Sequence, residues 1–275
     1  MTGGGAAMVQ VCCRYDGTFA GFLTCVFECY AHHECPAAFL TDGDAEETLW
    51  PERPVDTDRP RALRVYKALA GRVSPAFRQI IEKGFLTCLP QREVDLYALI
   101  RRGLDEGDRV RRDLTDPTVA RVMLAIRKLD TEVDHLKGFV RFSDVDGVLA
   151  GEIQPKNRVL PLLARHFSAR LSGERVALFD RTHREALFCG AGRWKILPVE
   201  EFEIGPGDET ERAFRALWRR FFRTISIQER HNPRCQMTHL PKRYRGAMLE
   251  FQAEEPPLSE PEAGSSGGIV PRLGD

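Results

Sequence analysis

The chain has 275 residues, of which 43% are hydrophobic and 29% charged, and its 40 Lys and Arg balance its 40 Asp and Glu. This is ordinary globular composition, with enough length for one large domain or two modest ones. No stretch approaches the roughly 18 apolar residues that a membrane-spanning helix needs, and the N-terminus lacks the basic and apolar regions of a signal peptide. We therefore expect a cytoplasmic protein with no membrane segment.

From the N-terminus, the pattern predicts a strand over 9–14 and a turn over 15–18, in which Thr18 caps a helix with apolar residues at spacings of three and four. Short strands are expected over 38–41 and 53–56. Four helices are expected next, beginning at Asp58, at Ser74-Pro75, at Glu93 and at Asp116-Pro117, the last ending near 134.

The second half of the chain has a pattern that predicts mostly strands. Strands are expected over 136–142 and 148–153 around a turn at 144–147, followed by a helix over 159–171 and strands over 175–180, 185–189 and 194–198. A last helix is expected over 208–225, and a disordered tail beyond 252.

The predicted fold class is α+β, with an N-terminal α/β and helical part joined to an antiparallel sheet flanked by helices. The expected segments are a disordered start, the N-terminal part, the sheet part with a basic C-terminal helix and loop, and an acidic disordered tail, over residues 1–8, 9–135, 136–251 and 252–275.

The eight cysteines include no C-x-x-C pair, and we interpret them as free thiols that serve as small hydrophobes. A group formed by Cys25, Cys29, His32, His33 and Cys35 suggests a metal or iron–sulfur site. Cys25 and Cys29, however, lie inside an apolar helix, so we predict no metal and no cofactor.

The strongest signal is a basic segment over 212–245, which holds ten Lys and Arg and a single acid, Glu229. Its first part is a predicted helix with apolar residues on one face and arginines on the other. Unbalanced arginines are suited to phosphate, because the guanidinium donates two parallel hydrogen bonds. We predict nucleic-acid contacts at Arg215, Arg219, Arg223, Arg230, His231, Asn232, Arg234, Lys242, Arg243 and Tyr244. The alternative for this helix is a solvated surface face.

Several motifs occur together in a fixed order: Tyr15-Asp16-Gly17-Thr18-Phe19, Gly138-Phe139-Val140-Arg141-Phe142, Leu160-Pro161-Leu162-Leu163 with His166-Phe167, Glu229-Arg230-x-Asn232-Pro233 and Leu240-Pro241-Lys242-Arg243-Tyr244. Together they resemble a bacterial family of unestablished activity, described as DNA metabolism or DNA repair proteins. Members of that family are encoded beside a radical SAM protein, and a similar domain is fused to uracil-DNA glycosylase-like domains. The resemblance implies a DNA-binding accessory partner of such a radical SAM protein.

Five residues are candidates for chemistry. His166 and Arg170 are one helical turn apart, and Asp180 ends the following strand, so together they suggest a phosphate site in which the aspartate fixes a histidine tautomer. Arg141 is a further candidate for this site. The alternative is a structural polar network. Asp16 precedes a helix start, where it either caps the helix or positions a ligand phosphate.

Motifs that bind nucleotide phosphates in motor proteins are absent from the sequence, which argues against an ATP-driven motor. Three hypotheses remain: a nucleic-acid-binding accessory protein in DNA repair or DNA metabolism, an enzyme that acts on a nucleic-acid base or phosphodiester, and a protein–protein adaptor.

Overall fold

The computed structural model describes residues 9–203 apart from 42 and 45–47, and beyond them Leu217, Tyr244, Arg245, Met248 and residues 270–272. The chain divides into two compact units between Leu129 and Asp130. The boundary expected from the sequence, between 135 and 136, lies within the same helix, α5 (Pro117–Phe139). The predicted α+β class is confirmed, because each unit combines a sheet with helices.

Unit 1 (residues 9–129 of the description) is built on a parallel sheet in the order β2-β1-β3. The strands are β1 (Val9–Tyr15), β2 (Glu34–Thr41) and β3 (Glu52–Pro54). A parallel pair needs a crossover connection, and α1 (Phe19–Ala31) supplies it between β1 and β2. Because β1 is central, the turn that follows it lies beside the loop that follows β3.

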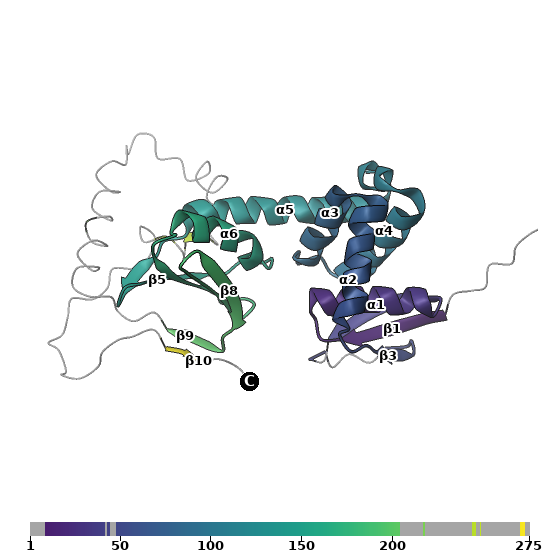
Figure 1. Ribbon diagram of the computed structural model, residues 1–275, viewed down its shortest axis with the longest axis horizontal. Helices are drawn as coiled ribbons and strands as arrows, with labels where there is room; N and C mark the ends of the chain where they lie inside the picture. The colour runs from purple at the N-terminus through teal and green to yellow at the C-terminus, as the bar shows by residue number, and fades with distance from the viewer. Residues whose placement is uncertain are drawn as a thin grey trace, which may run out of the picture. The chain divides into compact units, whose positions relative to one another are not determined.

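The other helices of unit 1 are α2 (Arg59–Ala68), α3 (Pro75–Phe85), α4 (Arg92–Glu106) and the first half of α5. They lie on the same side of the sheet as α1 (Figure 1). Three predicted helix starts are confirmed, since the side chains of Thr18, Asp58 and Ser74 each accept a hydrogen bond from a backbone N–H of the first turn. The core packs wholly buried side chains from several helices, among them Phe22, Phe77, Ile81, Leu96 and Ile100.

The cysteines of unit 1 belong largely to this core. Cys12, Cys13, Cys25 and Cys29 are buried free thiols, as predicted, whereas Cys88 is exposed. The Sγ atoms of Cys13 and Cys29 lie 3.7 Å apart across β1 and α1. Among the residues described, no group of three or more His, Cys, Asp and Glu is arranged to hold a metal ion.

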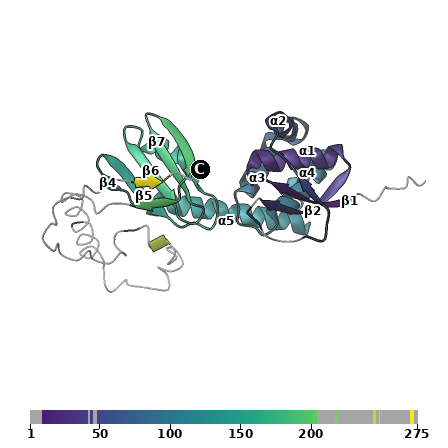
Figure 2. The same cartoon turned by 90° about the horizontal axis from the view of Figure 1, so that it is seen from below.

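Unit 2 (residues 130–203 and the later described positions) contains a five-stranded sheet in the order β4-β5-β6-β7-β8. Its strands are β4 (Ser143–Val145), β5 (Val148–Ile153), β6 (Arg175–Asp180), β7 (Glu185–Gly190) and β8 (Arg193–Pro198). Figure 2 shows β4 to β7 side by side. The neighbouring strands are antiparallel except for β5 and β6, which are parallel because α6 (Leu160–Arg170) carries the chain back between them.

The two faces of this sheet differ. The helix α6 packs against β7 and β8 and covers the face on which Leu178 and Leu187 are wholly buried. On the other face, Ala177, Phe179 and Ala186 form a separate apolar cluster. A small second sheet pairs β9 (Glu201–Glu203) with β10 (Val270–Arg272), and β10 lies in the segment for which we expected disorder.

The strand predicted over 136–142 is wrong, because α5 continues to Phe139 and the next strand begins at Ser143. Val133, Leu136 and Val140 are all buried, at spacings of three and four. The apolar face of α5 therefore extends into the run 136–142, whose alternation resembles that of a strand. In so short a run, periodicity alone does not distinguish a helix from a strand. No helix within the described ranges is both long and apolar enough to cross a membrane.

Candidate nucleic-acid interface

Most of the basic segment lies outside the described residues, including Arg215, Arg219, Arg223, Arg230, His231, Asn232, Arg234, Lys242 and Arg243. Tyr244 is described and is only 2% exposed. Its ring centroid lies 5.2 Å from that of His135 and 6.0 Å from that of Phe139, both on α5. A nucleic-acid base can therefore stack on Tyr244 only if this packing opens. Leu217, on the predicted apolar face of the last helix, is 61% exposed.

Asp16 holds the turn between β1 and α1. Its Oδ1 accepts from the backbone N–H and the hydroxyl of Thr18 at 2.9 and 2.8 Å, and its Oδ2 accepts from the Thr57 hydroxyl at 2.7 Å. Burial raises the pKa of Asp16, but the hydrogen bonds from Thr57 and Thr18 outweigh it and leave the pKa below its ordinary value. The carboxylate thus ties the turn after β1 to the loop after β3, while the side chain that caps α1 is that of Thr18.

Gly21 leaves the space that Asp16 occupies. A Cβ atom at this position would lie 2.2 Å from Asp16 Oδ1 and 2.9 Å from Thr57 Oγ1. We expect Gly21→Ala to lower the free energy of unfolding by about 1–3 kcal/mol, because one of the two loops must shift. Urea denaturation measures this change.

Gly138→Ala is the matched control, because a Cβ there meets nothing within 4 Å. This helical substitution should leave stability unchanged or raise it by up to about 1 kcal/mol. Equal stability of Gly21→Ala and the unaltered protein would contradict the role assigned to Asp16.

Asp180 ends β6 and is 0% exposed. Its Oδ2 lies 2.7 Å from His183 Nδ1, and its Oδ1 accepts from the backbone N–H groups of Thr182 and His183 at 2.9 and 3.1 Å. A carboxylate only accepts, so Nδ1 of His183 is the donor in this pair. The histidine that Asp180 contacts is therefore His183, three residues further along the same turn.

The remaining candidates make other contacts. His166, on α6, packs edge-on against Phe167, and desolvation together with the charges of Lys137 and Arg170 lowers its pKa. Arg141 donates to the carbonyl oxygens of Gly138 and Val140 at 3.0 and 3.4 Å, so it caps the end of α5.

A hollow of about 510 Å³ lies on the face of the five-stranded sheet opposite α6, beside the apolar cluster of Ala177, Phe179 and Ala186. Strand register explains its floor. Ala177 of β6 pairs with Phe188 of β7, and Phe188 pairs with Lys195 of β8, so these three side chains lie in one row on one face. Val148 of β5 completes the apolar lining. We call this site the sheet hollow.

Small residues create the space. Gly190 of β7 pairs with Arg193 of β8. On the other side of β7, Cys189 pairs with Val176 of β6, so the next residue, Gly190, lies opposite Arg175. Gly190 therefore lies between Arg193 and Arg175. A Cβ at Gly190 meets nothing within 4 Å. The absence of a side chain there opens the floor between two arginines.

The rim of the sheet hollow is basic. Arg175, Arg193 and Lys195 are all exposed. Arg175 Nη2 donates to the carbonyl oxygen of Asp146 at 3.3 Å, in the β4–β5 turn. Among the side chains described for residues 130–200, no ion pair joins any of the three to a carboxylate. In this part of the structure, three cations therefore stand around an apolar floor.

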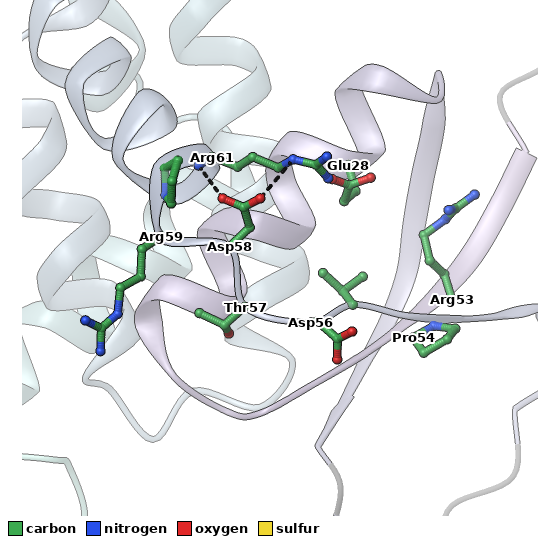
Figure 3. A pocket seen from close by; sticks show the side chains of 10 residues that line it. Glu28, Arg53, Pro54, Asp56, Thr57, Asp58, Arg59 and Arg61 are labelled. Atoms are coloured by element: carbon green, nitrogen blue, oxygen red, sulfur yellow. Dashed lines mark hydrogen bonds and ion pairs between the residues drawn. The ribbon is translucent and has the colours of Figure 1, made fainter.

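A second hollow, of about 570 Å³, lies in unit 1 along the loop after β3 (Figure 3). Its lining holds three carboxyl groups, of Glu28, Asp56 and Asp58, and three guanidinium groups, of Arg53, Arg59 and Arg61. Arg61 pairs with both Glu28 and Asp58. Because its charges balance and largely bond to one another, this hollow does not favour a polyanion.

A family model described as a domain of unknown function, DUF4130, matches residues 90–250, more than half of the chain. The chain belongs to the DUF4130 family. A search of curated proteins returns no match. The DUF4130 match contains the whole lining of the sheet hollow, from Val148 to Lys195, whereas the lining of the other hollow ends at Arg61 and lies outside it. The sheet hollow is therefore the candidate site within the DUF4130 region.

We did not predict the sheet hollow from the sequence. Arg193 and Lys195 alternate on a strand that follows a glycine, which is the one available signal. The row that joins Lys195 to Phe188 and Ala177 depends on which strands are neighbours, and local patterning does not determine that order.

Proposed function

We propose that this DUF4130 protein binds nucleic acid, DNA in particular, and that the sheet hollow is part of the interface. The observation that carries the proposal is the set of three cations, at Arg175, Arg193 and Lys195, without carboxylate partners in the described part of unit 2. They surround an aromatic and aliphatic floor. A nucleic acid offers both matching features, since its phosphates suit the rim and its bases suit the floor.

The broader role that we propose is an accessory function in DNA repair or DNA metabolism, in the cytoplasm, beside a radical SAM protein. Family resemblance supports this part of the proposal. The basic segment over 212–245 would extend the interface, because its ten Lys and Arg face a single acid in the sequence.

The two alternatives have less support. An enzyme requires acid–base groups that converge on a cavity, and neither hollow is lined by Asp16, Arg141, His166, Arg170 or Asp180. An adaptor that pairs with an acidic protein would use the cations, but it would give no role to Phe188 on the floor between them.

Binding should weaken and lose part of its salt dependence in the triple variant Arg175→Gln, Arg193→Gln, Lys195→Gln. Each phosphate contact contributes about 0.7 to the slope of log affinity against log salt for a single strand, and about 0.9 for a duplex. Removing three contacts should therefore reduce the magnitude of the slope by about 2 for a single strand and by about 3 for a duplex. Fluorescence anisotropy with labelled oligonucleotides over a range of salt concentrations measures it.

The matched control removes three exposed cations elsewhere, with Lys128→Gln, Lys156→Gln and Arg165→Gln. Both variants have the same net charge, so a general charge effect would lower the slope equally in both. An equal loss, or no binding by the unaltered protein to either single strands or duplexes, would overturn the proposal. Affinity purification with the neighbouring radical SAM protein, with and without DNA, tests the accessory role, which fails if that protein is never recovered.

A further inference from the structure

The shape of the sheet hollow indicates which form of nucleic acid it accepts. The hollow has a volume of about 510 Å³ and is shallow, so it presents its floor rather than enclosing a ligand. Its centre is apolar and its cations stand at the rim. A purely basic surface would meet the phosphates of a duplex equally well, whereas an apolar floor between the cations adds affinity only for an apolar group that lies against it.

We infer that the sheet hollow binds single-stranded nucleic acid, with one unstacked base against Phe188 and the adjoining phosphates at Arg193 and Lys195. This inference rests on the proposed function. In a duplex the faces of the bases are covered by their neighbours, so a base reaches Phe188 only after leaving the stack, at a cost of a few kcal/mol. In a single strand the base faces are accessible for stacking on aromatic side chains.

The register supports this placement. Phe188 and Lys195 are direct partners across β7 and β8, and Arg193 lies two residues before Lys195 on the same face. Two cations thus follow one edge of the floor at the spacing of alternate strand residues, roughly 6–7 Å. This matches a backbone that passes along β8 while a base turns inward over Gly190 and Phe188.

Gly190→Ile tests the inference because it fills the floor and removes none of the three cations. A Cβ at Gly190 has open space, and a β-branched residue suits a strand, so the variant should fold. Gly173→Ile is the matched control, since Gly173 also has open space around an added Cβ but lies in the turn between α6 and β6. Circular dichroism and thermal denaturation establish that both variants fold.

Anisotropy is measured with one sequence as single-stranded DNA, single-stranded RNA and duplex DNA. We expect the unaltered protein to bind at least one of the single strands more tightly than the duplex. Gly190→Ile should weaken binding of that single strand by about 5- to 100-fold, the loss of one base stack, and should leave duplex binding nearly unchanged. Phe188→Leu should weaken it similarly and Phe188→Tyr much less, because tyrosine retains a ring for stacking.

The inference is overturned if the duplex binds as tightly as both single strands, or if Gly190→Ile and Gly173→Ile behave alike. Either result would leave the proposed function standing, because nucleic acid would still bind. If no oligonucleotide binds at all, both proposals fail. If a single strand binds, the comparison of single-stranded DNA with single-stranded RNA shows which of the two sugars the site prefers.

Discussion

Glu132→Ala is expected to lower the free energy of unfolding of unit 2 by about 2–6 kcal/mol. Glu132, on α5, is 1% exposed, and its carboxyl group accepts from the backbone N–H groups of Lys156 and Asn157 at 3.2 and 3.0 Å and from Asn157 Nδ2 at 2.6 Å. Asn157 is 5% exposed. In Glu132→Ala, the backbone and side-chain amide groups of the buried Asn157 both lose their acceptor. Each buried donor left without a partner costs about 1–3 kcal/mol.

Asp134→Ala is the control on the same helix. Asp134 is 73% exposed and pairs with Lys137 at 3.0 Å, three residues further along α5. An exposed pair of this kind is worth less than about 1 kcal/mol, so the variant should be nearly as stable as the unaltered protein. Urea denaturation of both variants measures the difference. Similar costs for Glu132→Ala and Asp134→Ala would show that Glu132 does not hold the loop between β5 and α6.

Phe77→Ala should destabilise unit 1 by about 3–5 kcal/mol, because Phe77 is 0% exposed and its removal leaves a cavity between α3 and α4. Its ring lies against Gly103 of α4, where an added Cβ would be 2.4 Å from Cζ and 2.8 Å from Cε2. Gly103→Ala alone should therefore cost about 1–3 kcal/mol through overpacking.

The two substitutions should not be additive. In the Phe77→Ala background the clash partner is gone, and Gly103→Ala should become neutral or stabilising by up to about 1 kcal/mol through its better helix propensity. A double-mutant cycle, with free energies from chemical denaturation, measures this coupling. Additive costs would mean that the ring and the glycine do not contact each other.

Much of the fold follows from local signals that the sequence carries. Thr18, Asp58 and Ser74 predict helix starts, because each capping side chain accepts a hydrogen bond from a backbone N–H only three residues further along the chain. The turn at Asp146 and Gly147, where both residues have positive φ, likewise identifies the β4–β5 hairpin. Such features need no knowledge of the rest of the chain.

Features that depend on distant partners were not predictable in the same way. The parallel pairing of β5 with β6 follows from where α6 packs, and sequence alternation fits an antiparallel sheet equally well. The sequence predicts the end of α5 too early, because the burial of Leu136 and Val140 is not visible in a local pattern. The sheet hollow needs three strands in register, and the pairing of Asp180 with His183 needs the geometry of a turn.

Photo-crosslinking of a single strand containing 5-iodouracil, followed by mass spectrometry, tests the central claim most directly. If a base stacks over the floor of the sheet hollow, adducts should form on the peptide that contains Phe188, and Gly190→Ile should greatly reduce them. A complex that forms in solution yet places no adduct on residues 185–198 would contradict the assignment of the sheet hollow as a nucleic-acid interface.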